Sequence, residues 1–231
     1  MKNKQAMART LIIVSTILFT ICVYCYADRM CREYLDTPLG INVIKDQLLS
    51  MTEGASLPKG EWSCGIDISH HQPLVFWNNL KVYIDQNGRT VWKKKNATKE
   101  IRIDYVIMKA SEGETFRDWR FRHRWKKADK FTYKRGAYHF FRPGKDGEAQ
   151  ARNFISQVGD IGPEDFPPIL DIEKTDGLSV ETINRRALEW LQIIEKHYGR
   201  KPIIYANSHY LNNILSSEIS QRYPVWVANY G

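Results

Sequence analysis

Cysteine is scarce in this sequence, and most of the chain has none. The 231 residues hold four cysteines, at positions 22, 25, 31 and 64, and none follows Cys64. This distribution argues against a thiol nucleophile in the body of the chain, and no later Cys-x-x-Cys pair with His or Cys partners supports a zinc site. Neither a metal nor a cofactor is predicted. Cys31 and Cys64 could form a disulfide in an oxidising compartment or remain two free thiols.

Charge is absent from one long stretch near the N-terminus. The run Thr10–Tyr26 is 17 uncharged and almost wholly apolar residues, and Lys2, Lys4 and Arg9 precede it. This length falls between the core of a cleavable signal peptide and a membrane span of about 20 residues. The preceding cations favour export of the rest of the chain. We therefore expect residues 1–27 to be a signal anchor or a signal peptide, with the anchor favoured, and the protein to lie in the cell envelope or be secreted.

The remaining chain divides by composition into a linker and one domain. Residues 28–60 place prolines and glycines around a single short periodic patch, which indicates a stalk. From about Trp62 the composition is that of a globular domain of ordinary size, so we assign residues 61–231 to one domain.

Strand-like and helix-like patterns alternate within that domain. Helical spacing is clearest from Ser179 to Tyr198, where Ser179 is a candidate N-cap and Gly199 a stop. Alternating strands and helices, with polar groups at strand ends, predict an α/β fold, a mainly parallel sheet and a barrel of the TIM type. The predicted strands are Gly65–Ser69, Ile103–Ser111, Gly136–Phe141, Pro168–Glu173, Pro202–Asn207 and Pro224–Tyr230.

One stretch, residues 81–102, interrupts the alternation. Two short apolar runs flank Asn87-Gly88, and this dipeptide is a strong signal for a tight hairpin turn. We predict an inserted hairpin with a structural role.

Two carboxylates stand one residue apart at the end of the apolar run that begins at Pro168. Side chains at positions i and i+2 of a strand share a face, so Asp171 and Glu173 should project together. Their repulsion in a partly desolvated site would raise the pKa of one of them, which is how a protein keeps a general acid protonated near neutral pH. An isolated Asp-x-Glu is also typical of an acidic strand end that meets solvent.

Six motifs in order resemble glycoside hydrolase family 25, the Chalaropsis-type lysozymes. The resemblance covers roughly residues 65–231, and its motifs are Gly65–His70, Val106–Gly113, Gly136–Phe140, Leu170–Glu173, Ile203–Tyr205 and Val225–Tyr230. It implies a modified (β/α)5(β)3 barrel with an N-terminal hydrophobic helix in front of it. It also implies hydrolysis of the β-1,4 bond between N-acetylmuramic acid and N-acetylglucosamine in peptidoglycan.

The resemblance also implies roles for individual residues. Glu173 would be the general acid, Asp171 would tune it or stabilise the substrate's N-acetyl group, and Asp67 would complete an anionic floor. Carboxylates that face the same opening of the barrel would stabilise a transition state in which the sugar ring is positively charged. The implied substrate-binding residues are Tyr138, Tyr205, Trp226, Lys109 and Glu112. Each aromatic residue fits a place in the barrel core equally well.

The sequence departs from the family pattern in three places. His71 stands where the family usually has Trp, and Ser111 stands where it usually has Thr. Only six of eight barrel strands are found, so we expect a C-terminally incomplete barrel. A non-catalytic domain that binds cell-wall glycan is the alternative function.

The chain is basic, with 34 Lys and Arg against 26 Asp and Glu. Residues 117–130 are dense in cations at helical spacing, which suits attraction to an anionic cell wall, although most of these side chains are expected on a solvated helix face. No nucleic-acid motif is present, and no nucleic-acid partner is predicted. We expect His123 to be solvated and His139 to point out of the barrel as a packed or hydrogen-bonded residue.

Overall fold

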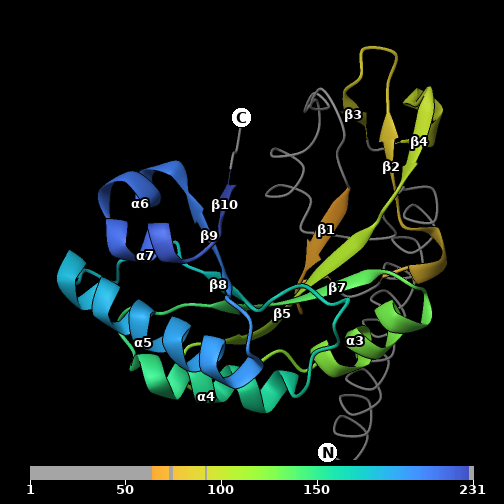
Figure 1. Ribbon diagram of the computed structural model, residues 1–231. Helices are drawn as coiled ribbons and strands as arrows, with labels where there is room; N and C mark the ends of the chain where they lie inside the picture. The colour runs from red at the N-terminus through yellow and green to blue at the C-terminus, as the bar shows by residue number, and fades with distance from the viewer. Residues whose placement is uncertain (1–63, 73–74, 92, 229–231) are drawn as a thin grey trace, which may run out of the picture.

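The computed structural model describes residues 64–72, 75–91 and 93–228 as a mixed α/β fold (Figure 1). Its main sheet has six parallel strands in the order β1-β5-β7-β8-β9-β10, with β6 antiparallel beside β5. The strands are β1 (Gly65–Ile68), β5 (Tyr105–Glu112), β6 (Phe116–Arg117), β7 (Lys134–Phe140), β8 (Ile169–Asp171), β9 (Ile203–Asn207) and β10 (Val225–Ala228). All six parallel strands were predicted from the sequence.

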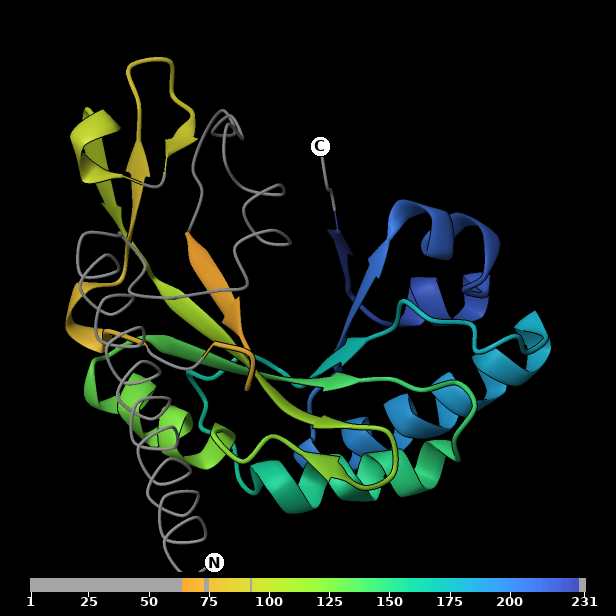
Figure 2. The ribbon, with the colours of Figure 1, turned by 180° about the vertical axis from the view of Figure 1, so that it is seen from behind.

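The sheet curls into an open half-barrel. Strands β1 and β10 rise at its two sides, and α3 (Phe121–Lys130), α4 (Gly147–Val158) and α5 (Val180–Tyr198) lie along its outer face (Figures 1 and 2). Within the described residues, β1 and β10 each pair with one neighbour, β5 and β9 respectively. The inner face of the sheet is therefore bounded by two edge strands.

Alternation along the strands decides which side chains face the helices. Every second strand residue packs against helix side chains in a continuous core. The residues between them therefore point to the inner face of the sheet. The fully buried members from strands and helices include Val106, Met108, Leu170, Ile204, Phe154, Trp190, Leu191 and Ile194. Burial of these and the other apolar side chains of the core is the main source of stability for the fold.

The helices α4 and α5 begin at side-chain caps and end at glycines. The Thr182 N–H donates to Ser179 Oγ at 3.3 Å at the start of α5, and Gly199 takes the left-handed conformation with φ 63° at its end. Asp146 caps α4 by accepting from the Ala149 N–H at 2.7 Å. The Ser179 and Gly199 predictions are confirmed.

The insertion forms a small antiparallel sheet. Strands β2 (Lys81–Ile84) and β3 (Thr90–Val91) flank the turn at Gly88, whose φ is 75°, and β4 (Lys99–Arg102) pairs on the other side of β2. Short 3₁₀ helices, η1 (Trp77–Asn79) and η2 (Lys94–Asn96), lie beside it. The sequence signal was limited to the turn and its two flanks, so the third strand was not predicted.

Two short helices between β9 and β10 were also not predicted. They are α6 (Ser208–Asn213) and α7 (Ser217–Arg222), and the side chains of Asn207 and Ser216 cap them. Each has only six residues, fewer than two helical turns, so neither can show a clear 3.6-residue period.

The N-terminal predictions fall outside the described residues. The apolar helix within residues 1–27, the stalk at 28–60 and Cys31 with its proposed disulfide all lie there. In the part of the chain that the structure describes, no helix is long and apolar enough to cross a membrane.

The close approach of α4 to α5 generates a testable prediction. A Cβ added at Gly147 would lie 2.3 Å from the backbone oxygen of Arg186 in α5, which has little freedom to move. Helix propensity alone favours Ala over Gly, whereas the clash predicts that Gly147→Ala lowers the free energy of unfolding by about 1–3 kcal/mol. Chemical denaturation measures the change, and Ser156→Ala on the exposed side of α4 is the control. An unchanged or raised stability would contradict the contact.

Candidate active site

Three carboxylates lie near one another on the inner face of the half-barrel. Asp67 is in β1, Asp171 ends β8, and Glu173 follows two residues later. The Ile172 N–H donates to the Tyr205 carbonyl at 2.9 Å, which extends the β8–β9 pairing past the end of the strand. Ile172 is fully buried, so Asp171 and Glu173 on either side of it project to the opposite face.

These carboxyl groups interact electrostatically. Burial raises the pKa of Asp171 well above its usual range, and the charges of Glu173 and Asp67 add to the effect while Lys109 opposes it. Crowding by protein atoms also raises the pKa of Asp67, with a further contribution from Glu173, although a backbone hydrogen bond opposes it and the side chain still reaches solvent. The Oδ1 atom of Asp171 is buried and has no hydrogen-bond partner in the described residues. The predicted raised pKa is therefore found on Asp171.

Three aromatic side chains lie on the same face of the sheet as this acidic group. Burial raises the pKa of Tyr138 well above 10, and the nearby charges of Asp67 and Asp171 add to it, which keeps the phenol neutral. Tyr205 and Trp226 are paired across β9 and β10, with ring centroids 5.1 Å apart at an interplanar angle of 77°. Trp226 is 38% exposed, unlike an ordinary core residue. Asp171 pairs in register with Tyr205, so acid and aromatic groups share one level of the sheet.

Lys109 and Glu112 occupy the same inner face but are bonded to each other. A bulge in β5 between Lys109 and Ser111 brings two residues three positions apart onto one side. Lys109 Nζ donates to Glu112 Oε2 at 2.6 Å, and Arg142 donates to Glu112 Oε1 through Nε at 2.8 Å and Nη2 at 2.5 Å. Burial would raise the pKa of Glu112, but these hydrogen bonds outweigh it and leave the pKa below its usual value.

Arg142 was not predicted, although it directly follows the apolar run of β7. Its place after a strand end is the same signal that singled out Asp171. Lys109 is 7% exposed, and its ammonium lies 4.9 Å from the Phe140 ring centroid and 5.5 Å from that of Phe116. Because this ammonium is enclosed and ion-paired, its main effect on the site is electrostatic: its positive charge lowers the pKa of Asp171.

His139 lies on the other face of the sheet, as predicted. It is fully buried, and its Nε2 donates to Gln150 Oε1 at 3.1 Å because that amide oxygen can only accept. Its Nδ1 then accepts from Ser111 Oγ at 2.8 Å. Gln150 also accepts from the Arg142 N–H at 2.9 Å, so this buried network fixes the backbone of the loop that carries Arg142.

The loop after β1 is held by side chains from residues 117–130. Arg124 is 5% exposed and donates to the carbonyl oxygens of Ser69, at 2.5 Å, and Gln72. Asp118 accepts from the His70 N–H at 2.5 Å. Arg124 is thus an exception to the predicted solvated face, while His123 is exposed as predicted.

The described residues contain no group of three or more His, Cys, Asp or Glu side chains arranged to hold a metal ion. The chemistry available on the inner face is that of coupled carboxyl groups beside aromatic rings.

Comparison with known families identifies the domain. The model of glycosyl hydrolases family 25 matches residues 66–231. The chain belongs to this family. The match starts at β1 and includes every strand of the curled sheet, so the acidic group on its inner face lies within the family 25 domain.

Relatives and solved structures agree with this family 25 assignment. YegX of Escherichia coli K12, described as uncharacterized, is 35% identical over 166 residues, which are 72% of this chain and 56% of YegX. Lysozyme M1 of Streptomyces globisporus is 28% identical over 180 residues, 72% of this chain and 54% of the relative. A family 25 glycosyl hydrolase from Bacillus anthracis superimposes with a TM-score of 0.61 at 26% identity, covering 76% of this chain and 73% of that one. The chain spans little more than half the length of these curated relatives.

The buried His139 network makes the stability of this family 25 domain depend on pH. Burial, with the charge of Lys109, lowers the pKa of His139 to about 4. Between the ordinary value near 6.5 and about 4, the unfolded chain binds a proton that the folded chain does not, so acidification through this window lowers the free energy of unfolding. We expect a contribution on the order of 3 kcal/mol that is fully present above pH ~6.5.

The measurement is denaturant unfolding at several pH values between about 7 and 4. His139→Gln cannot titrate and should lack this part of the pH dependence, whereas His123→Gln, at an exposed position, should behave as wild type. Parallel pH profiles for wild type and His139→Gln would contradict the assignment.

Proposed function

We propose that this chain is a peptidoglycan muramidase that hydrolyses the β-1,4 bond between N-acetylmuramic acid and N-acetylglucosamine. The observation that carries the proposal is the coupled group of Asp67, Asp171 and Glu173 on the inner face of a family 25 domain. A relative named as a lysozyme supports the same reaction class.

Glu173 is the proposed general acid. Its charge acts on the neighbouring Asp171, whose raised pKa keeps a proton beside Glu173 at a pH where an ordinary aspartate has lost it. Acid catalysis needs a proton delivered to the leaving glycosidic oxygen as its bond to the anomeric carbon breaks. A proton shared by this pair would serve that step.

The other two carboxyl groups have proposed supporting roles. Asp171 tunes the acid and lies close enough to Glu173 to meet the N-acetyl group of the same sugar. Asp67 adds negative charge opposite β8, which stabilises the positive charge that develops on the sugar ring in the transition state.

The aromatic and ion-paired residues are proposed to bind the glycan. Tyr205 and the exposed Trp226 offer ring faces to sugars, and Tyr138 offers a neutral hydroxyl beside the acids. Lys109 and Glu112 would contribute through their fixed ion pair.

We further propose that the half-barrel is part of a (β/α)5(β)3 barrel, and that residues 1–27 direct export to the cell envelope and can anchor the chain in the membrane. The first rests on the similarity to the solved family 25 structure. The second rests on the apolar N-terminal run in the sequence.

Substitution of the proposed acid tests the function. Glu173→Gln removes the transferable proton with little change in shape, so release of reducing ends from purified peptidoglycan should fall at least a hundredfold while the melting temperature stays near that of wild type. Glu164→Gln makes the same change at an exposed position and should keep full activity.

Comparable cleavage by Glu173→Gln and wild type would rule out Glu173 as the acid. A folded wild-type protein that binds peptidoglycan but releases no ends would instead support the non-catalytic, glycan-binding alternative.

A further inference from the structure

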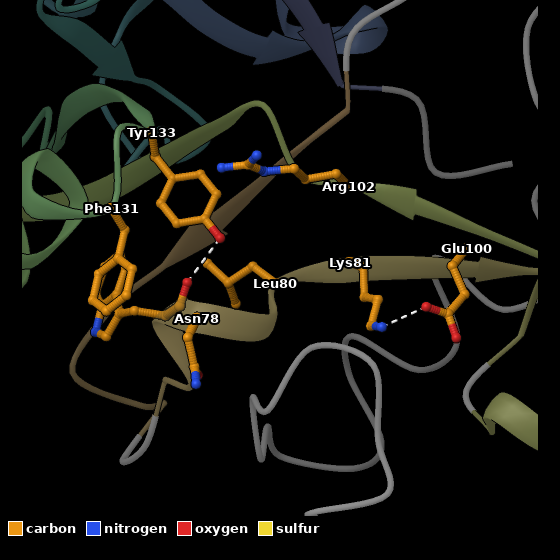
Figure 3. A pocket seen from close by; sticks show the side chains of 8 residues that line it. Asn78, Leu80, Lys81, Glu100, Arg102, Phe131 and Tyr133 are labelled. Carbon is orange, nitrogen blue, oxygen red and sulfur yellow. Dashed lines mark hydrogen bonds and ion pairs between the residues drawn. The ribbon is translucent and has the colours of Figure 1, made fainter.

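A pocket lies at the base of the inserted sheet, and none of the three carboxylates of the acidic group lines it. It has a volume of about 470 Å³ and is lined by Trp77, Asn78, Leu80, Lys81, Glu100, Arg102, Phe131 and Tyr133 (Figure 3). These residues come from η1, β2, β4 and the loop after α3, and none of them is a proposed catalytic residue. The volume falls in the range of pockets that hold small molecules.

The charges around this pocket favour an anion. Glu100 is bonded to both Lys81 and Lys94, with the Lys94 contact at 2.9 Å, so one carboxylate balances two ammonium groups. Arg102 adds a third positive charge. Its guanidinium lies 5.9 Å from the centroid of the Tyr133 ring and has no ion pair or hydrogen bond with any described residue. In Figure 3 the Arg102 side chain extends toward the Tyr133 ring.

The whole insertion, residues 81–102, carries a net positive charge. Residues 81–102 contain seven Lys or Arg and two Asp or Glu, a net charge of +5 within a chain whose total is +8. Charge concentrated on one small sheet raises the local concentration of an anionic partner near the pocket.

The remaining wall of the pocket is aromatic and rigid. The Tyr133 hydroxyl donates to the Trp77 carbonyl at 2.8 Å, and the two rings have centroids 6.4 Å apart. Phe131 and Leu80 extend this apolar wall, and Asn78 adds an amide that can donate and accept. An apolar wall, one amide and a planar guanidinium fit a ring with polar substituents and a carboxylate, which an arginine binds with two parallel hydrogen bonds.

We propose that this pocket is an accessory site for a sugar ring that carries a carboxylate, with Arg102 binding the carboxylate and the Trp77 and Tyr133 wall packing against the ring. Uronic acids and muramic acid with a free lactyl group share this chemistry. The site would hold an acidic glycan on the cationic insertion, and its binding does not depend on hydrolysis at Glu173.

The test is a titration of the ¹⁵N-labelled full chain followed through the Arg102 Nε–H resonance and the backbone amides of Leu80 and Phe131. The probes are D-glucuronic acid, D-glucose as the same ring without the carboxylate, acetate as the carboxylate without the ring, and N-acetylmuramic acid. Glucuronic acid should bind at least tenfold more tightly than glucose or acetate. Comparing it with N-acetylmuramic acid tells which source of the carboxylate the pocket prefers.

Three variants locate the binding. Followed through the Leu80 and Phe131 amides, Arg102→Gln should weaken glucuronic acid binding at least tenfold, and Arg102→Lys should give an intermediate loss because it keeps the charge without the planar fork. Arg89→Gln removes an exposed charge from the same small sheet outside the pocket and should stay within twofold of wild type. Equal losses for Arg102→Gln and Arg89→Gln, or equal binding of glucuronic acid and glucose, would overturn the site. Equal affinities for acetate and glucuronic acid would contradict the proposal that the pocket binds the sugar ring.

Discussion

The account of this site depends on one constraint, the burial of Asp171 beside the carboxyl groups of Asp67 and Glu173, which repel it. Three carboxylates cannot all ionise easily in a crowded, partly desolvated place, so one of them retains its proton to higher pH. The sheet enforces the proximity, because Ile172 is locked into the core and paired with β9 while its two acidic neighbours face inward. The strain of this arrangement is offset by the apolar packing between sheet and helices.

A fourth carboxylate on the same face, Glu112, shows the opposite behaviour. Glu112 receives hydrogen bonds from Lys109 and Arg142 and has a lowered pKa, whereas Asp171 has a buried oxygen without a partner in the described residues and a raised one. The difference lies in the burial of Asp171 and in the two cationic hydrogen-bond donors, Lys109 and Arg142, that Glu112 has. It separates a carboxylate that fixes local structure from one suited to hold a proton for chemistry.

Much of this could be predicted from the sequence, because strand alternation and helix capping are local signals. The six parallel strands, the caps of α5 and the outward position of His139 follow from such patterns. The third strand of the insertion and the six-residue helices α6 and α7 could not be predicted in the same way. The position of Arg142 after a strand was visible in the sequence, but its partner was not. The third strand and the partner of Arg142 depend on pairings between residues far apart in the chain, such as Glu112 and Arg142, whereas α6 and α7 are too short to show a helical period. The choice of Asp171 as the protonated partner also required knowledge of its burial.

The most direct test is a ¹³C NMR titration of the Asp171 side-chain carboxyl carbon in wild type and in Glu173→Gln. The account predicts that the pKa of Asp171 lies well above the usual value for aspartate, because of burial and the charges of Glu173 and Asp67, and that loss of the Glu173 charge lowers it. An Asp171 carboxyl that titrates near its usual value in both proteins would contradict the coupling from which the proposed catalysis follows.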